Sequence, residues 1–146
     1  KSVHLGEDVT IIEPSNLYGC SLDDNVFVGP FVEIQKNVSI GKNTKIQSHS
    51  FICELVTIGS NCFIGHGVVF INDKLSEGGP AMGDTSKWGE TLIEDHVSIG
   101  SNSSILPVKI CRNVVIGAGS VVTKDITLPG VYAGNPARLI TKEDHA

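Results

Sequence analysis

The sequence predicts an all-β protein built from one repeated coil, and three observations carry this prediction. Large apolar side chains recur every six residues from Val28 to Phe70. Smaller residues, mostly β-branched or weakly polar, stand two positions before each of them, from Val26 to Val68. Gly, Asn, Ser and Asp, which favour turns, fill much of the remainder of each hexad. A fixed period of this kind is typical of repeat architectures.

Each hexad fits one short strand followed by one corner. A helix needs apolar residues at a spacing of about 3.6, so a spacing of six would scatter them around its surface. Side chains two positions apart share one face of a strand. Three strands and three corners then close a triangular coil, and stacked coils bury a continuous aliphatic core. The apolar series is Val28, Ile34, Ile40, Ile46, Ile52, Ile58, Ile64 and Phe70.

Every third hexad returns to the same face, so the count predicts which residues stack. One face holds Ile11, Val28, Ile46, Ile64, Ile99 and Ile116, and the next holds Ile34, Ile52, Phe70, Ile105 and Val122. The corner between these faces collects Gly65, Gly100 and Gly117, followed by His66, Ser101 and Ala118. The next corner aligns Asn72 with Pro107 and Lys124. These columns assume that the interruption after Phe70 adds no turn of coil.

The pattern is interrupted once and ends once within a single domain, residues 1–146. Residues 73–90 are rich in Gly, Ser, Asp and Pro, and the apolar series resumes only at Ile93, which predicts a long extruded loop. The corner before Ile110 is one residue short. Leu128, Pro129 and Gly130 end the series, so a tail of about residues 129–146 is expected to leave the coil.

Composition narrows the class of partner. A formal charge of −5 argues against nucleic acid and anionic membrane surfaces. No apolar run approaches the ~20 residues that span a bilayer, and no signal-peptide pattern opens the chain. The four cysteines show no CxxC spacing, so we expect reduced thiols in a cytoplasmic protein.

The hexads IGKNTK, IGSNCF, IGHGVV, IGSNSS and IGAGSV resemble those of the hexapeptide-repeat acyltransferases. The resemblance implies a left-handed parallel β-helix, a homotrimer, and acetyl-CoA held in a trough at the subunit interface. It assigns this trough to the small residues above His66, to two cations that can meet phosphates, and to the tail AGNPARLI. The cofactor-binding residues so implied are Gly100, Ser101, Gly117, Ala118, Lys124, Asn135, Pro136 and Arg138. The competing interpretation is that small residues serve only to form tight corners.

The segments EIQKN, KIQSHSFIC, HGVVFINDK and SKWGETLIEDHVSIGSNSSILP are similar to those of nucleotide-sugar N-acetyltransferases. Those enzymes acetylate an amino group on a UDP- or dTDP-linked amino sugar used for surface glycans, lipopolysaccharide included. Galactoside and serine O-acetyltransferases of this fold use a His base, and the galactoside type carries it close to the position of Asn72–Asp73. A neutral amine attacks a thioester without strong base assistance, so the absence of a His in this loop favours an amine acceptor.

The resemblance implies direct transfer, with named roles. Asn72 orients the amine or the acyl group, His66 or Asp73 takes a proton, and a corner N–H of Gly117 or Ala118 stabilises the oxyanion. The candidates for binding the sugar nucleotide are Gln35, His49, Lys74 and Trp88. Trp88 either stacks on a base or anchors the loop on a neighbouring subunit.

Three other functions compete with this one. The first is an O-acetyltransferase acting on a sugar or another small hydroxyl acceptor. The second is a zinc enzyme like the γ-type carbonic anhydrases, which share this prism and use three His ligands; only His49 and His66 lie near each other here, so we predict no metal. The third is a scaffold without activity, against which the loop and tail argue.

Overall fold

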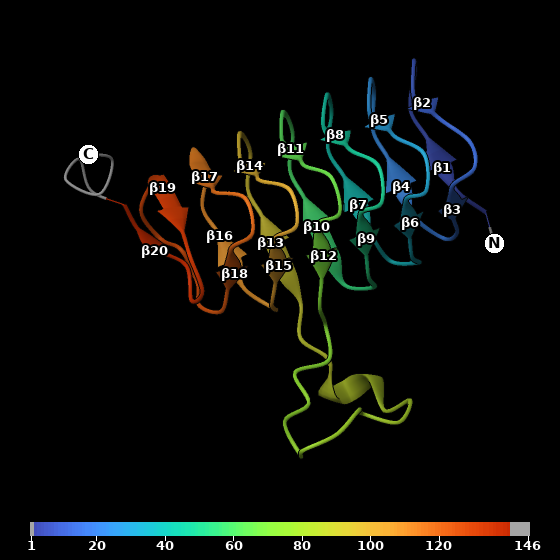
Figure 1. The fold of residues 1–146 in the computed structure, drawn as a ribbon. Helices are drawn as coiled ribbons and strands as arrows, with labels where there is room; N and C mark the ends of the chain where they lie inside the picture. The colour runs from blue at the N-terminus through green and yellow to red at the C-terminus, as the bar shows by residue number, and fades with distance from the viewer. Residues whose placement is uncertain (1, 141–146) are drawn as a thin grey trace.

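The computed structural model describes residues 2–140, which wind around one axis as a parallel β-helix with the predicted hexapeptide coils (Figure 1). The first sheet holds β1 (His4–Leu5), β4 (Ser21–Leu22), β7 (Ser39–Ile40), β10 (Val56–Ile58), β13 (Thr91–Ile93) and β16 (Lys109–Ile110). The second holds β2 (Thr10–Ile11), β5 (Phe27–Val28), β8 (Lys45–Ile46), β11 (Phe63–Ile64), β14 (Ser98–Ile99), β17 (Val114–Ile116), β19 (Gly130–Ala133) and β20 (Arg138–Leu139). The third holds β3 (Asn16–Leu17), β6 (Glu33–Ile34), β9 (Phe51–Ile52), β12 (Val69–Phe70), β15 (Ser104–Ile105) and β18 (Val121–Val122).

The strand register confirms the predicted columns. Ile64 pairs with Ile46 on one side and with Ile99 on the other, and Ile99 pairs with Ile116. The pairing of Ile64 with Ile99 crosses the loop, so the loop adds no coil. The expected fold class, a left-handed parallel β-helix of hexapeptide repeats with an extruded loop, is confirmed.

The core is a ladder of isoleucines, and its weakly polar positions are hydrogen-bonded. The buried hydroxyl of Thr44 donates to the Gly59 carbonyl oxygen at 2.7 Å, and that of Ser50 donates to the Gly65 carbonyl oxygen at 2.7 Å. A hydroxyl two positions before an isoleucine therefore binds a carbonyl oxygen at the same corner of the next coil, and so links the two coils. Among residues 2–140, every buried side-chain nitrogen or oxygen atom has a hydrogen-bond partner.

The loop leaves the coil between β12 and β13 and projects from the side of the prism (Figure 1). It contains one short 3-10 helix, η1 (Thr85–Lys87). An antiparallel bridge joins Asp73 to Trp88, and the Gly89 N–H donates to the Asn72 carbonyl oxygen at 2.8 Å. The two ends of the loop are thus tied together where they meet the coil, at the predicted boundaries.

The prediction that the tail leaves the coil at about residue 129 is wrong. Strand β19 continues the second sheet in parallel with β17, so that Tyr132 pairs with Ile116 and packs against the core. Its hydroxyl donates to the Leu128 carbonyl oxygen at 2.8 Å, which lets a polar ring fill an apolar position. Strand β20 then returns antiparallel to β19. The remainder of the predicted tail, residues 141–146, lies outside the described residues.

All four cysteines are free thiols, as expected, and Cys20, Cys53 and Cys62 are buried. Burial raises the pKa of each of these three thiols. Along residues 2–140, no helix is both long enough and apolar enough to cross a membrane.

Candidate active site

A pocket of about 350 Å³ lies on the third sheet where the loop joins the coil. It brings together four of the predicted site residues, Gln35, Asn72, Asp73 and Trp88, from positions far apart in the sequence. The full lining is Gln35, Phe51, Cys53, Val69, Phe70, Ile71, Asn72, Asp73 and Trp88. Aromatic and aliphatic walls with a few polar groups are the usual composition of a small-molecule site. We call this feature the loop pocket.

Asn72 is held by both its main chain and its side chain. Its Nδ2 donates to the carbonyl oxygen of Glu54, one coil below, at 3.1 Å, while its own carbonyl oxygen accepts from Gly89. The side-chain bond uses only one of the two amide hydrogens. The amide is therefore fixed in orientation and keeps hydrogen-bonding capacity for a ligand in the loop pocket.

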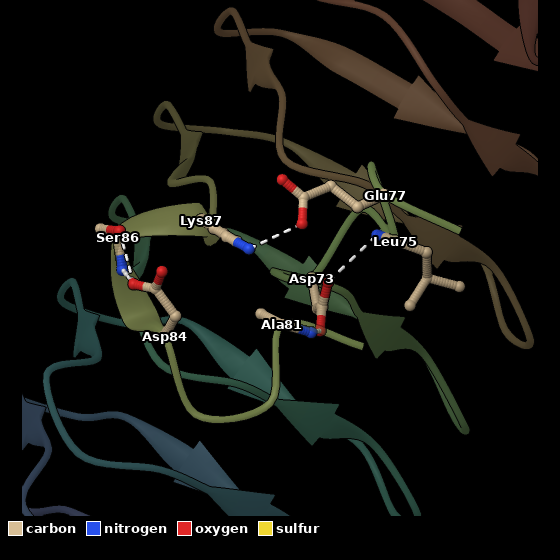
Figure 2. Close-up of polar contacts among 7 residues, drawn as sticks. All are labelled: Asp73, Leu75, Glu77, Ala81, Asp84, Ser86 and Lys87. Atoms are coloured by element: carbon tan, nitrogen blue, oxygen red, sulfur yellow. Dashed lines mark hydrogen bonds and ion pairs between the residues drawn. The ribbon is translucent and has the colours of Figure 1, made fainter. Parts of the chain in front are cut away.

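The carboxylate of Asp73 organises the loop (Figure 2). Its Oδ1 accepts the Leu75 N–H at 3.0 Å, and its Oδ2 accepts the Ala81 N–H at 2.7 Å. These bonds, that from Ala81 first, lower the pKa of Asp73 below its ordinary 3.8. Such a carboxylate stays charged at neutral pH and is a weak proton acceptor. An ion pair of 2.7 Å between Lys87 and Glu77 closes the same loop (Figure 2).

The other predicted residues of this region differ in how firmly they are held. The Gln35 Oε1 accepts the Glu54 N–H at 3.1 Å, and its Nε2 donates to Glu33 at 3.1 Å. Trp88 is half-buried, whereas Lys74 is exposed beside the end of the loop. Gln35 is therefore held in the pocket wall by its side-chain bonds, Trp88 lies half-buried in the same wall, and Lys74 is exposed beside it.

His66 lies on a different edge of the prism, the corner between the second and third sheets. Its main-chain N–H donates to Ser101 Oγ at 3.0 Å, and its Nδ1 stands 3.5 Å from the same oxygen. Its own carbonyl oxygen accepts the Asn102 N–H at 2.8 Å. The imidazole is exposed, so this corner presents a titratable ring to solvent. We call residues 29–31, 47–49, 65–67, 100–102 and 117–119 the histidine edge.

Small residues on the histidine edge are required by close backbone approach. A Cβ on Gly65 would stand 2.8 Å from the Ser101 nitrogen, and one on Gly100 would stand 2.5 Å from the Ala118 nitrogen. Any side chain at these glycines would push the stacked coils apart. Gly65 and Gly100 are therefore required by the close approach of the next coil, and they also keep the surface above His66 low.

The tail covers the last coil of the histidine edge. The Ala133 Cβ stands 3.0 Å from where a Cβ of Gly117 would be, and Ala133 pairs with Arg138. The hydrogen bonds from the Val121 N–H to Gly134 and from the Ala137 N–H to Val121 place Asn135 and Pro136 at this end of the prism. The structure thus gathers these predicted cofactor residues near Gly117 and Ala118. Lys124 instead follows β18, in the column of Asn72 and Pro107.

The two predicted oxyanion donors differ. The Gly117 N–H donates to the Tyr132 carbonyl oxygen at 2.8 Å and is already used. Within residues 2–140, nothing accepts a hydrogen bond from the Ala118 N–H. Only the Ala118 amide is therefore available to a developing negative charge on the corner of the last coil.

One chain does not bring His66 and the loop pocket together. The pocket lies at the end of β12, whereas His66 precedes β12, so the strand separates them.

His49 lies on the histidine edge one coil below Gly67 and stacks on Phe31, with ring centroids 5.0 Å apart and an interplanar angle of 26°. The sequence analysis did not single out Phe31. Its place at a corner position that is mostly Asn in other coils could have indicated it. Among the described residues, no group of three His, Cys, Asp or Glu side chains is placed to hold a metal ion.

Comparison with known proteins agrees with this architecture. A family model described as the hexapeptide repeat of succinyl-transferase matches residues 55–71 and 91–124, and one described as the bacterial transferase hexapeptide matches residues 19–54. The bifunctional protein GlmU of Thermosipho africanus is 39% identical over 126 residues, which is 86% of this chain and 25% of that protein. The chain thus spans about a quarter of the length of this curated relative.

Two solved structures are similar over nearly the whole chain. A point mutant of AntD, an N-acyltransferase from Bacillus cereus in complex with dTDP and coenzyme A, is 27% identical with a TM-score of 0.71, covering 94% of this chain and 81% of that one. The hexapeptide-repeat acetyltransferase VCA0836 from Vibrio cholerae, complexed with acetyl coenzyme A, is 26% identical with a TM-score of 0.70, covering 94% and 69%. Because the two hexapeptide models together match more than half of its length, the chain belongs to the hexapeptide-repeat transferases.

Proposed function

We propose that the protein transfers acetyl from acetyl-CoA to the amino group of a UDP- or dTDP-linked amino sugar. The product would serve surface-glycan synthesis, lipopolysaccharide included, in the cytoplasm. The observation that carries the proposal is the likeness to AntD, an N-acyltransferase crystallised with dTDP and coenzyme A, over 94% of this chain. The loop pocket supports it, because Gln35, Asn72 and Trp88 form a ligand-sized site beside a loop that has no histidine.

The separation of the histidine edge from the loop pocket within one chain supports a homotrimer. His66 and the small residues of the histidine edge lie on one edge of the prism, and Asn72 lies on another. A neighbouring copy related by rotation can place its loop pocket against the histidine edge of the first. We therefore propose that each active site takes His66 from one subunit and Asn72 from the next.

In this arrangement acetyl-CoA lies along the histidine edge beneath the tail. Gly100, Ser101 and Ala118 leave room for the pantetheine arm, with Gly117 beside them and Asn135 and Pro136 at the end of the trough. Arg138, and Lys124 from a neighbouring edge, supply positive charge for the phosphates of the cofactor. No metal takes part in the proposed reaction.

The chemical step is a direct displacement. The neutral sugar amine attacks the thioester carbon, a C–N bond forms, the C–S bond breaks, and coenzyme A leaves as the thiolate. Asn72 orients the amine, the Ala118 N–H faces the developing oxyanion, and His66 accepts the ammonium proton. We assign Asp73 to holding the loop and not to accepting the proton, because its carboxylate already accepts two N–H bonds and its pKa is lowered.

The alternative is an O-acetyltransferase, which needs a base strong enough to deprotonate a hydroxyl. Thiol release from acetyl-CoA, measured against a panel of UDP-, dTDP- and GDP-linked sugars with and without chelator, separates the two. Release with an amino sugar, insensitive to chelator, supports the proposal. Release only with hydroxyl acceptors selects the alternative, and no release together with no acetyl-CoA binding leaves the fold without an assigned activity.

A further inference from the structure

Phe31 and His49 occupy a backbone conformation that the coil gives mostly to Gly or Asn. Both residues have positive φ, 60° and 67°. Along the histidine edge the same position is filled by Gly67, Asn102 and Gly119, and elsewhere in the coil mostly by Asn, with Leu55 and His96 as the bulky exceptions. A bulky residue in the left-handed region costs on the order of 1–2 kcal/mol. Two such residues on adjacent coils need a reason outside the local backbone.

Packing within the chain does not supply that reason. Phe31 is 57% exposed, and His49 is exposed as well. Their rings stack on each other, 5.0 Å between centroids, and not on the core. The pair therefore presents an aromatic surface to solvent.

A cavity adjoins the phenyl ring. It has a volume of about 330 Å³ and is lined by Pro14, Ser15, Asn16, Phe31, Val32 and Glu33. Asn16 and Glu33 are register partners on β3 and β6, so their side chains stand next to each other on the outer surface of the third sheet. The cavity thus combines an apolar wall, an aromatic plane, an amide and a carboxylate.

We infer that the Phe31–His49 pair is the platform for the nucleobase of a nucleoside diphosphate. A base stacks on an aromatic plane whatever its identity, and its polar edge finds donors and acceptors in Asn16 and Glu33. This inference rests on the proposed function, whose acceptor is nucleotide-linked. It assigns a role to His49 and adds Phe31, Asn16 and Glu33 to the site.

The position along the edge fits the rest of such a ligand. His66 lies two coils from Phe31, a separation of about 10 Å along the coil axis at the usual strand spacing. The diphosphate lies between the base and the sugar of the ligand, so the sugar is directed toward His66. Lys45 points outward from β8, on the same coil as His49, and offers a cation to the diphosphate.

The test uses Phe31→Asn and His49→Asn, because Asn is the residue that other corners carry in this conformation, so the coil is preserved. His96→Asn is the matched control, since His96 has φ 58° on a corner away from the histidine edge. Phe31→Tyr keeps the aromatic plane. Binding of dTDP, UDP, GDP and acetyl-CoA is measured by calorimetry on the assembled protein, and its sedimentation is checked for each variant.

We expect the wild type to bind at least one of the three diphosphates. Phe31→Asn should weaken that binding roughly 5- to 150-fold, the range that loss of one stacked base predicts. His49→Asn should weaken diphosphate binding less than Phe31→Asn does. Phe31→Tyr and His96→Asn should change the diphosphate affinity by less than about threefold, because both keep the stacked ring of residue 31. The affinity for acetyl-CoA should be unchanged in all four variants.

Unchanged diphosphate binding in Phe31→Asn would overturn the platform and leave the proposed function standing. Loss of binding accompanied by a smaller sedimenting species would overturn it too, because the pair would then be a subunit contact. A wild type that binds none of the three diphosphates would remove both the nucleotide-linked acceptor and the platform.

Discussion

The side-chain amide of Asn72 donates to the main-chain carbonyl oxygen of Glu54 at 3.1 Å. This bond joins the last residue before the loop to the corner of the coil below it. The amide is thereby held in one orientation at the wall of the loop pocket, which is what a group that positions an acceptor requires.

Replacement of Asn72 by Ala should lower kcat roughly 10- to 100-fold, because a misplaced acceptor loses the geometry of attack. The KM for acetyl-CoA should stay within about twofold, since the proposed cofactor trough follows the histidine edge and not the loop pocket. Steady-state kinetics with both substrates varied give the two constants. Ser76→Ala, in the exposed part of the same loop, is the control. An Asn72→Ala enzyme with unchanged kcat would remove this residue from the mechanism.

Asp73→Asn should loosen the loop. An amide offers one acceptor oxygen, so the bonds from Leu75 and Ala81 cannot both be kept on separate oxygens. Trp88 is the single tryptophan and forms a bridge with residue 73, so its fluorescence reports the root of the loop. We expect a changed Trp88 emission and faster proteolysis within residues 73–90 in this variant. Glu77→Gln, which breaks the Lys87 ion pair, should have a smaller effect.

The pH dependence of the same loop follows from the lowered pKa of Asp73. A group whose pKa is lower in the folded state contributes stability above its ordinary value of 3.8, and that stability is lost as pH falls through the lower, folded value. The Trp88 emission of the wild type should therefore be constant from pH 7 to about pH 4 and change only at lower pH. A transition centred near pH 6 would show that another group controls the loop.

Cys53 lines the loop pocket, yet it should not carry the acetyl group. Burial raises the pKa of this thiol to about 12, so the nucleophilic thiolate is almost absent at neutral pH. We expect Cys53→Ala to keep kcat within a few-fold and mass spectrometry of the enzyme with acetyl-CoA to find no acetylated Cys53. An acetyl-enzyme on this residue would replace direct transfer by a two-step route.

The proposed trimer predicts a dependence of activity on exposed apolar residues beside the histidine edge. Phe63 points outward from β11 and is 40% exposed. Phe63→Glu should give a smaller species in sedimentation and abolish activity, while the β signal in circular dichroism persists. Leu92→Glu, at 37% exposure on the first sheet, is the matched control and should keep both assembly and activity. An active monomer would contradict a site shared between subunits.

Most of the fold was predictable because the hexad is periodic. The pairing of Ile64 with Ile99 across the loop followed from counting hexads and assuming that the loop adds no coil, and so did the alignment of Gly65, Gly100 and Gly117. The tail was not predictable in this way. Tyr132 is half-buried and packs against the core outside the aliphatic pattern. Its hydroxyl donates to the Leu128 carbonyl oxygen, and no spacing rule predicts that bond.

The sequence predicted some of the residues that line the loop pocket, and it did not predict the contacts that hold them. The pocket gathers Gln35, Asn72 and Trp88 as expected, but the sequence does not tell that Asp73 spends both carboxylate oxygens on loop amides. Contacts of that kind depend on how an irregular loop folds back, which no period encodes. The stacking of Phe31 on His49 was missed because the two residues look like separate departures from the corner pattern.

The most direct test of N-acetyl transfer compares two acceptors that differ in one functional group: a nucleotide-linked sugar with an amino group, and the same sugar with a hydroxyl at that carbon. Acetyl-CoA is supplied to both, and the products are identified by mass and by stability to mild base. If the protein is an N-acetyltransferase, the amino sugar gives an N-acetyl product and its hydroxyl analogue gives no measurable product. A base-labile ester formed from the hydroxyl analogue at a comparable rate would contradict that assignment.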